Sequence, residues 1–217
     1  MNGDLISRLE IKYRRYAIRN LMTIIIGAMG AVYVLDALAQ AFIPGGVSQY
    51  LFFSRSLVLR GQLWRIITFT MLPPGTNTLT VVFSLYLYWI IGSALNNRWG
   101  SFRFNLFYLC GVAGSVLSGL ITGMTTNEYL NLSLFFAFAI LYPDFQLLLF
   151  FILPVKMKYL AILNAAFFLI SFFRVPLSHQ IAMITALLNL ALFFWRDIIR
   201  LAKQYTRRIR FLNATRR

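Results

Sequence analysis

The sequence predicts an all-α integral membrane protein with six transmembrane helices. Hydrophobic residues make up 59% of the 217 residues, charged residues make up only 12%, and the apolar residues gather into long segments. Soluble domains have about 45–50% apolar and about 25% charged residues. The composition therefore excludes a water-soluble globule, a disordered chain and a coiled coil.

Six apolar segments can be drawn along the chain, and breaker residues separate several of them. The first ends at Ile43-Pro44-Gly45-Gly46, the second follows Pro73-Pro74-Gly75, and the fourth stops at Pro143-Asp144. The first is also too long for a cleavable signal peptide. We treat residues 1–195 as a single transmembrane domain and residues 196–217 as a basic cytoplasmic tail. The six segments cover residues 18–42, 78–95, 102–124, 130–142, 159–173 and 177–195.

Positive charges decide the number of crossings, because hydropathy alone also allows five or seven. The fourth segment is short, and residues 145–153 could be a re-entrant or interfacial piece or part of a span. Seventeen Lys and Arg residues flank the segments on the side that holds both termini, and four lie on the other side. Lys and Arg are enriched in cytoplasmic loops. We therefore expect both termini in the cytoplasm, six crossings and a bacterial inner membrane.

Few residues are available for a disulfide or a metal centre. Cys110 is the single cysteine, His179 is the single histidine, and the chain has six acidic residues. One cysteine excludes an internal disulfide, and cysteine-based zinc sites need several. We expect no metal, no cofactor and no nucleic-acid partner. The net charge of +15 is instead expected to orient the chain and to hold the basic tail on anionic lipid.

The first loop, residues 43–77, is long and rich in large apolar residues, which predicts an amphipathic segment embedded in the outer leaflet. A solvated loop is the alternative. Trp64 suits the headgroup level, and the fork of donors on Arg65 can bind several carbonyl groups at once. We predict that Arg65 binds main-chain carbonyls of this loop and that Trp64 lies at the outer interface. The alternative is a contact between Arg65 and a lipid phosphate.

Small residues indicate where helices pack closely. On the third segment a small residue recurs at every fourth position: Gly111, Ser115, Gly119 and Gly123. Such a stripe lets helix backbones approach one another. We expect the third segment to lie at the centre of the bundle, with a homodimer interface as the alternative.

Two further polar side chains lie within predicted spans. Asp36 either sits at the outer interface or pairs with Arg65 or Arg60, because an intramembrane carboxylate is costly when it is unpaired. Asn164 could form a hydrogen bond to another helix.

Several motifs resemble, in order, those of the rhomboid family of intramembrane proteins. They lie within about residues 60–195 and read GQLWRIIT from residue 61, GSALNNRWGSFRF from residue 92, YPD from residue 142 and FFILPVK from residue 150. The resemblance implies a six-transmembrane-helix rhomboid-like bundle with a membrane-embedded first loop. It also implies that the protein handles transmembrane segments of other membrane proteins.

The family's catalytic positions are almost all replaced. In active members a serine opens the fourth span, a histidine on the sixth activates it, and a histidine and an asparagine on the second help to hold the oxyanion. By the family's spacing, the serine position falls on Glu128, and the oxyanion positions fall on Thr80 and Ser84. Only His179 remains. A serine needs a base to become a strong nucleophile, and the intermediate needs preorganised donors.

Three functions follow as hypotheses. The first is a rhomboid-fold membrane pseudoprotease that binds transmembrane helices of client or partner proteins without cleaving them. The second is an active intramembrane serine endopeptidase with a displaced dyad of Ser133 and His179. The third is a structural subunit of a larger membrane complex. Ser133 would more often only bind a carbonyl of its own helix, and His179 could be a hydrated polar anchor.

Overall fold

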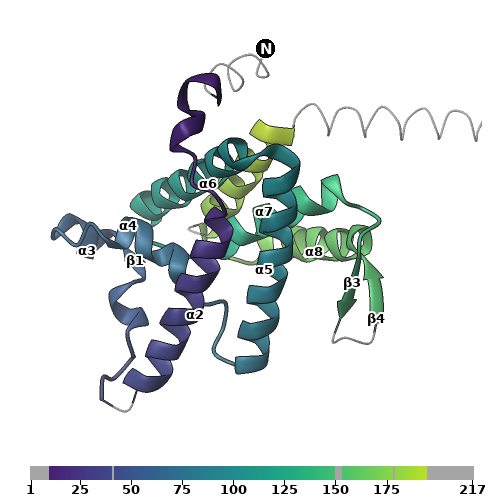
Figure 1. The fold of residues 1–217 in the computed structure, drawn as a ribbon. Coiled ribbons are helices and arrows are strands. Elements are labelled where there is room, and N and C mark those ends of the chain that lie inside the picture. Colours follow the sequence, from purple (N-terminus) through teal and green to yellow (C-terminus); the bar gives the residue numbers. More distant parts are fainter. Residues whose placement is uncertain (1–9, 41, 150–152, 178, 195–217) are drawn as a thin grey trace, which may run out of the picture.

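The computed structural model describes residues 10–40, 42–149, 153–177 and 179–194 (Figure 1). Three helices are long and apolar enough to cross a membrane, and three more are apolar but shorter. The long ones are Glu10–Ala39, whose apolar part is α2 (Leu21–Ala39), α5 (Thr78–Trp99) and α6 (Ser101–Thr122). The shorter ones are α7 (Glu128–Leu141), α8 (Met157–Phe172) and the last helix, His179–Phe194. The predicted apolar, helical character is confirmed, and each predicted segment contains a helix.

Local sequence explains several helix ends. The Asn77 side chain accepts a hydrogen bond from the Leu79 N–H at 2.9 Å and so caps α5 after the Pro73-Pro74-Gly75 break. The chain turns from α5 into α6 at Gly100, whose φ of 81° lies in the left-handed region that glycine adopts without strain.

The first loop is an ordered substructure of short elements. It contains η2 (Ser48–Tyr50), β1 (Phe53–Ser54), α3 (Arg55–Leu59), α4 (Arg65–Thr68) and η3 (Phe69–Met71). Strand β1 pairs antiparallel with β2 (Met124–Thr125), which directly follows α6. The buried side chains of Phe53, Val58 and Phe69 form a small core against α6. The loop is thus anchored to the end of α6.

The segment between α7 and α8 contains a β-hairpin, which the sequence analysis did not predict. Strands β3 (Gln146–Leu149) and β4 (Leu153–Lys156) form an antiparallel hairpin, with Gln146 opposite Lys156. Residues 150–152 lie outside the described residues. The paired strands exclude a helix over Gln146–Leu149 and Leu153–Lys156, and the interpretation of residues 145–153 as a re-entrant or interfacial piece stays a prediction.

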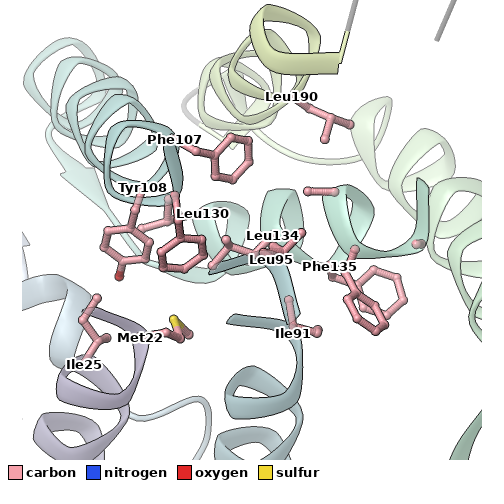
Figure 2. Close-up of a cluster of buried hydrophobic side chains, with 14 of the residues drawn as sticks. Met22, Ile25, Ile91, Leu95, Phe107, Tyr108, Leu130, Leu134, Phe135 and Leu190 are labelled. Atoms are coloured by element: carbon pink, nitrogen blue, oxygen red, sulfur yellow. The ribbon is translucent and has the colours of Figure 1, made fainter. Parts of the chain in front are cut away.

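The main core is formed between α2, α5, α6 and α7 (Figure 2). Met22 comes from α2, Ile91 and Leu95 from α5, and Phe107 from α6, and their side chains converge on Leu130 and Leu134 of α7. Eight of the 14 residues of α7 are buried, against eight of the 22 residues of α6. The expectation that the third segment is the centre was therefore incomplete, because α7 is the more fully buried helix.

The stripe of small residues on α6 packs against other parts of the same chain. A Cβ atom on Gly111 would lie 2.3 Å from Leu130 Cδ1, and one on Gly119 would lie 2.5 Å from a Phe53 ring carbon. Ser115 between them is buried. Gly123 differs, because it ends α6 with a φ of 99° and no atom lies within 4 Å of the Cβ position. The first three members therefore serve intramolecular packing.

Asn164 does not reach another helix. Its side-chain amide donates to the Leu160 carbonyl, one turn earlier on α8, at 3.0 Å. The expected interhelical hydrogen bond of Asn164 was wrong because its own helix offers a nearer acceptor.

Candidate functional site

The Arg65 side chain makes several hydrogen bonds within the first loop. Its side chain is only 3% exposed, and one guanidinium nitrogen donates to the Gln49 carbonyl at 3.0 Å and to the Phe52 carbonyl at 2.8 Å. The Arg65 Nε donates to Gln62 Oε1 at 2.7 Å. The expected bonds to main-chain carbonyls of the loop are present. A buried guanidinium cannot also reach a lipid phosphate, so the phosphate alternative does not fit this geometry.

Trp64 and Thr68 hold the same stretch of backbone. The Trp64 indole N–H donates to the Tyr50 carbonyl at 3.1 Å, and the Thr68 hydroxyl donates to the Leu51 carbonyl at 3.0 Å. The main-chain carbonyls of residues 49–52 therefore all accept hydrogen bonds from the side chains of Trp64, Arg65 or Thr68. Trp64 is 52% exposed, and its place at the outer interface stays a prediction.

Asp36 holds the start of the loop through backbone groups. One of its carboxylate oxygens accepts hydrogen bonds from the Val47 N–H at 2.6 Å and the Ser48 N–H at 2.8 Å, and the other accepts one from the Ser48 hydroxyl. Of the two alternatives for Asp36, the ion pair with Arg60 or Arg65 is not formed. The two main-chain donors lie close by and satisfy the carboxylate without a cation.

Asn127, just before α7, joins that helix to the loop. Its buried side-chain amide donates to the Thr70 carbonyl at 3.3 Å and to the Leu72 carbonyl at 2.8 Å. We did not predict this contact, because the partners are more than 50 residues apart and no local pattern indicates it. The beginning of α7 is therefore fixed against the first loop.

The two dyad candidates do not bind one another. Ser133 is buried and its hydroxyl donates to the Leu130 carbonyl of its own helix at 2.7 Å. His179 is exposed, and its Nδ1 lies 3.5 Å from the Tyr129 hydroxyl. Within the described part of the chain, no hydrogen bond joins Ser133 and His179. Tyr129 lies one helical turn before Ser133, so His179 faces the beginning of α7.

The residues that the rhomboid resemblance places at catalytic positions lie near the beginnings of two different helices. Glu128 is the exposed first residue of α7, Thr80 is exposed in the first turn of α5, and Ser84 is half-buried one turn later. Glu128 is a carboxylate and not a neutral hydroxyl nucleophile, and it favours the helix N-terminus electrostatically. In the described ranges, no group of three or more His, Cys, Asp or Glu side chains could hold a metal.

Comparisons of this chain with protein-family models, curated proteins and solved structures gave no match.

Tyr108 on α6 and Asn131 on α7 are buried polar residues. The Tyr108 hydroxyl and the Asn131 amide make no hydrogen bond of normal geometry with any described residue. Figure 2 shows the Tyr108 hydroxyl on the side of the cluster where Met22 and Ile25 of α2 lie. Buried polar groups without partners are uncommon and usually destabilise the fold. Tyr108, with Leu109, belongs to the run of motifs that resembles the rhomboid family, whereas no sequence pattern singled out Asn131.

Proposed function

We propose that this chain is a rhomboid-like membrane protein that binds transmembrane segments of other proteins without cleaving them. The observation that carries the proposal is the separation of the two dyad candidates. The Ser133 hydroxyl is engaged by its own helix, and His179 faces Tyr129. A serine hydroxyl that donates to a helix carbonyl, with no base bonded to it, is not activated as a nucleophile. We also propose that the chain lies in a bacterial inner membrane with both termini in the cytoplasm.

An exposed apolar stripe on α5 supports the binding of a partner helix. Its members follow a spacing of three or four residues along one face: Leu79, Val82, Tyr86 and Trp89. Such a stripe is the pattern with which a helix contacts a neighbouring helix. The opposite side of α5 packs against α2, α6 and α7, so the stripe faces away from the bundle.

Two aromatic residues of this stripe lie in the middle of α5 and not at its ends. The rings of Tyr86 and Trp89 stack with their centroids 6.5 Å apart. Tyr and Trp are typical of the membrane–water interface, where their polar atoms stay hydrated. Neither the Tyr86 hydroxyl nor the Trp89 indole N–H makes a hydrogen bond within the described residues. A partner helix with a polar acceptor near its centre would satisfy them.

A crosslinking experiment tests this function. The chain is reconstituted in vesicles with a synthetic single-span peptide of Leu and Ala that carries one central Asn. A photoreactive residue replaces Val82 on the α5 stripe or, as a matched control, Leu117 on the exposed face of α6. We expect crosslinks from position 82 and few from position 117. The Tyr86→Phe/Trp89→Phe variant should reduce the preference for the Asn peptide over an all-apolar peptide.

Equal crosslinking from both positions would contradict a specific helix-binding surface on α5. Cleavage of the peptide would contradict the proposal that binding occurs without proteolysis.

A further inference from the structure

We propose that residues 10–19, together with the start of α6, form a binding surface for anionic phospholipid headgroups. Residues 10–13 are helical, η1 (Arg14–Tyr16) follows, and the chain then enters α2. Figure 1 shows this segment beside α6, at the end of the bundle where α2 begins.

Two contacts hold the segment in place. Glu10 forms an ion pair with Arg103 of α6, with 2.8 Å between a carboxylate oxygen and Arg103 Nε. The buried side-chain amide of Asn105, also on α6, donates to the Ile18 carbonyl at 3.1 Å. Because the contacts lie near the two ends of the segment, its intervening side chains are presented at a defined position on the bundle.

The side chains that project from this segment are strongly basic. Lys12, Arg14, Arg15 and Arg19 are all exposed. Arg98, also exposed, lies near the end of α5. The acidic residue of the segment, Glu10, is already engaged by Arg103. A surface of this charge attracts anions, and each basic residue near an anionic leaflet strengthens binding about fivefold.

Exposed apolar and aromatic residues alternate with these charges, which distinguishes a lipid from a free phosphate ion. Ile11 is 85% exposed and Tyr16 is 65% exposed, and Tyr13 and Ile18 are exposed as well. The Arg15 guanidinium lies 4.8 Å from the centre of the Tyr16 ring. Interfacial segments place apolar side chains at the acyl boundary and basic ones at the phosphates. A free phosphate ion would contact only the basic side chains and not the apolar ones.

The test compares two double variants of the full chain in nanodiscs of phosphatidylcholine with increasing phosphatidylglycerol. Arg14→Gln/Arg15→Gln removes two charges from the proposed surface. Arg60→Gln/Arg174→Gln removes two exposed charges elsewhere. Native mass spectrometry measures how much phosphatidylglycerol stays bound. The basic tail is present in all variants, so differences between them report on the substituted residues.

We expect the Arg14→Gln/Arg15→Gln variant to need up to about 25-fold more phosphatidylglycerol for the same retention, and the control variant to match the wild type. Inorganic phosphate at millimolar concentration should not displace the lipid. Equal losses in both variants, or displacement by phosphate, would overturn the proposal. If Arg14→Gln/Arg15→Gln fails to fold, Lys12→Gln/Arg19→Gln gives the same comparison, and retention unchanged from the wild type in that variant would overturn it too.

Discussion

Arg65 shows how a single buried side chain can organise a loop. Carbonyl groups that water cannot reach are costly to leave unpaired, and two of them are satisfied by one guanidinium nitrogen here. The Arg65 guanidinium also lies over the Phe52 ring, at 4.9 Å from its centre. The buried Arg65 side chain therefore stabilises the loop both by hydrogen bonds and by its contact with the Phe52 ring.

The Arg65→Ala variant should lower the free energy of unfolding by about 2 kcal/mol or more, because hydrogen bonds from a charged donor are strong and the freed carbonyls stay buried. The measurement is thermal unfolding in detergent. Arg60→Ala is the control, because Arg60 lies in the same loop and is exposed; it should change the stability by about 0.5 kcal/mol or less. Equal losses in the two variants would contradict the role of Arg65.

At the scale of elements, the close approach of β1 to α6 depends on the absence of a side chain at Gly119. The Phe53 ring occupies the place that a Cβ atom would take, and Phe53 is fully buried. The loop is held to the bundle by this contact and by the pairing of β1 with β2.

Gly119→Ala should destabilise the protein by about 1–3 kcal/mol, because an extra methyl group in a packed interface forces neighbours apart. Gly27→Ala on α2 is the matched control, since no atom lies within 4 Å of its Cβ position. In that helix interior, alanine should be neutral or stabilise by up to about 1 kcal/mol. Chemical or thermal unfolding of both variants would show the difference, and a stable Gly119→Ala protein would refute the packing argument.

The hairpin between α7 and α8 has a charge cluster at its base. Lys158 Nζ donates to an Asp144 carboxylate oxygen at 2.9 Å, and Lys156 Nζ lies 3.7 Å from the same oxygen. The hydrogen bond and charge of Lys158, with the charge of Lys156, hold the pKa of the Asp144 carboxyl below its ordinary value.

A carboxyl whose folded pKa is lowered stabilises the fold above its unfolded pKa, and that contribution is lost as the pH falls through the folded pKa. The wild type should therefore lose more thermal stability than Asp144→Asn when the pH is lowered from 6 to 3. The difference should be small because Asp144 is exposed and solvent screens its charge. Melting curves of both proteins across this range measure it. A steeper loss in Asp144→Asn would have the wrong sign for this account.

Across the whole molecule, the sequence predicted what depends on local composition. The long apolar runs correctly predicted a helix in every segment. The several N–H donors of the Arg65 guanidinium correctly predicted hydrogen bonds to main-chain carbonyls. The hydrogen-bond partners of Asp36 and Asn127 are main-chain groups that lie far away in the sequence. Only the fold decides which of these groups come near. The β3–β4 hairpin was missed because a short apolar run has no period that separates strand from helix.

The candidate site was predictable only as a set of positions. The sequence identified Ser133 and His179 as the two side chains that could form a dyad. It could not place them, because the rotation of α7 and the position of the last helix are set by packing with the core. Tyr129, the contact of His179, was not predicted for the same reason.

The central proposal is that Ser133 is not an activated nucleophile. The most direct measurement is labelling of the full chain with a fluorophosphonate probe in detergent and in liposomes, beside the Ser133→Ala and His179→Ala variants. We predict no labelling above that of the Ser133→Ala variant. Labelling of the wild type that disappears in both variants would show a working Ser133–His179 dyad and would contradict the proposal.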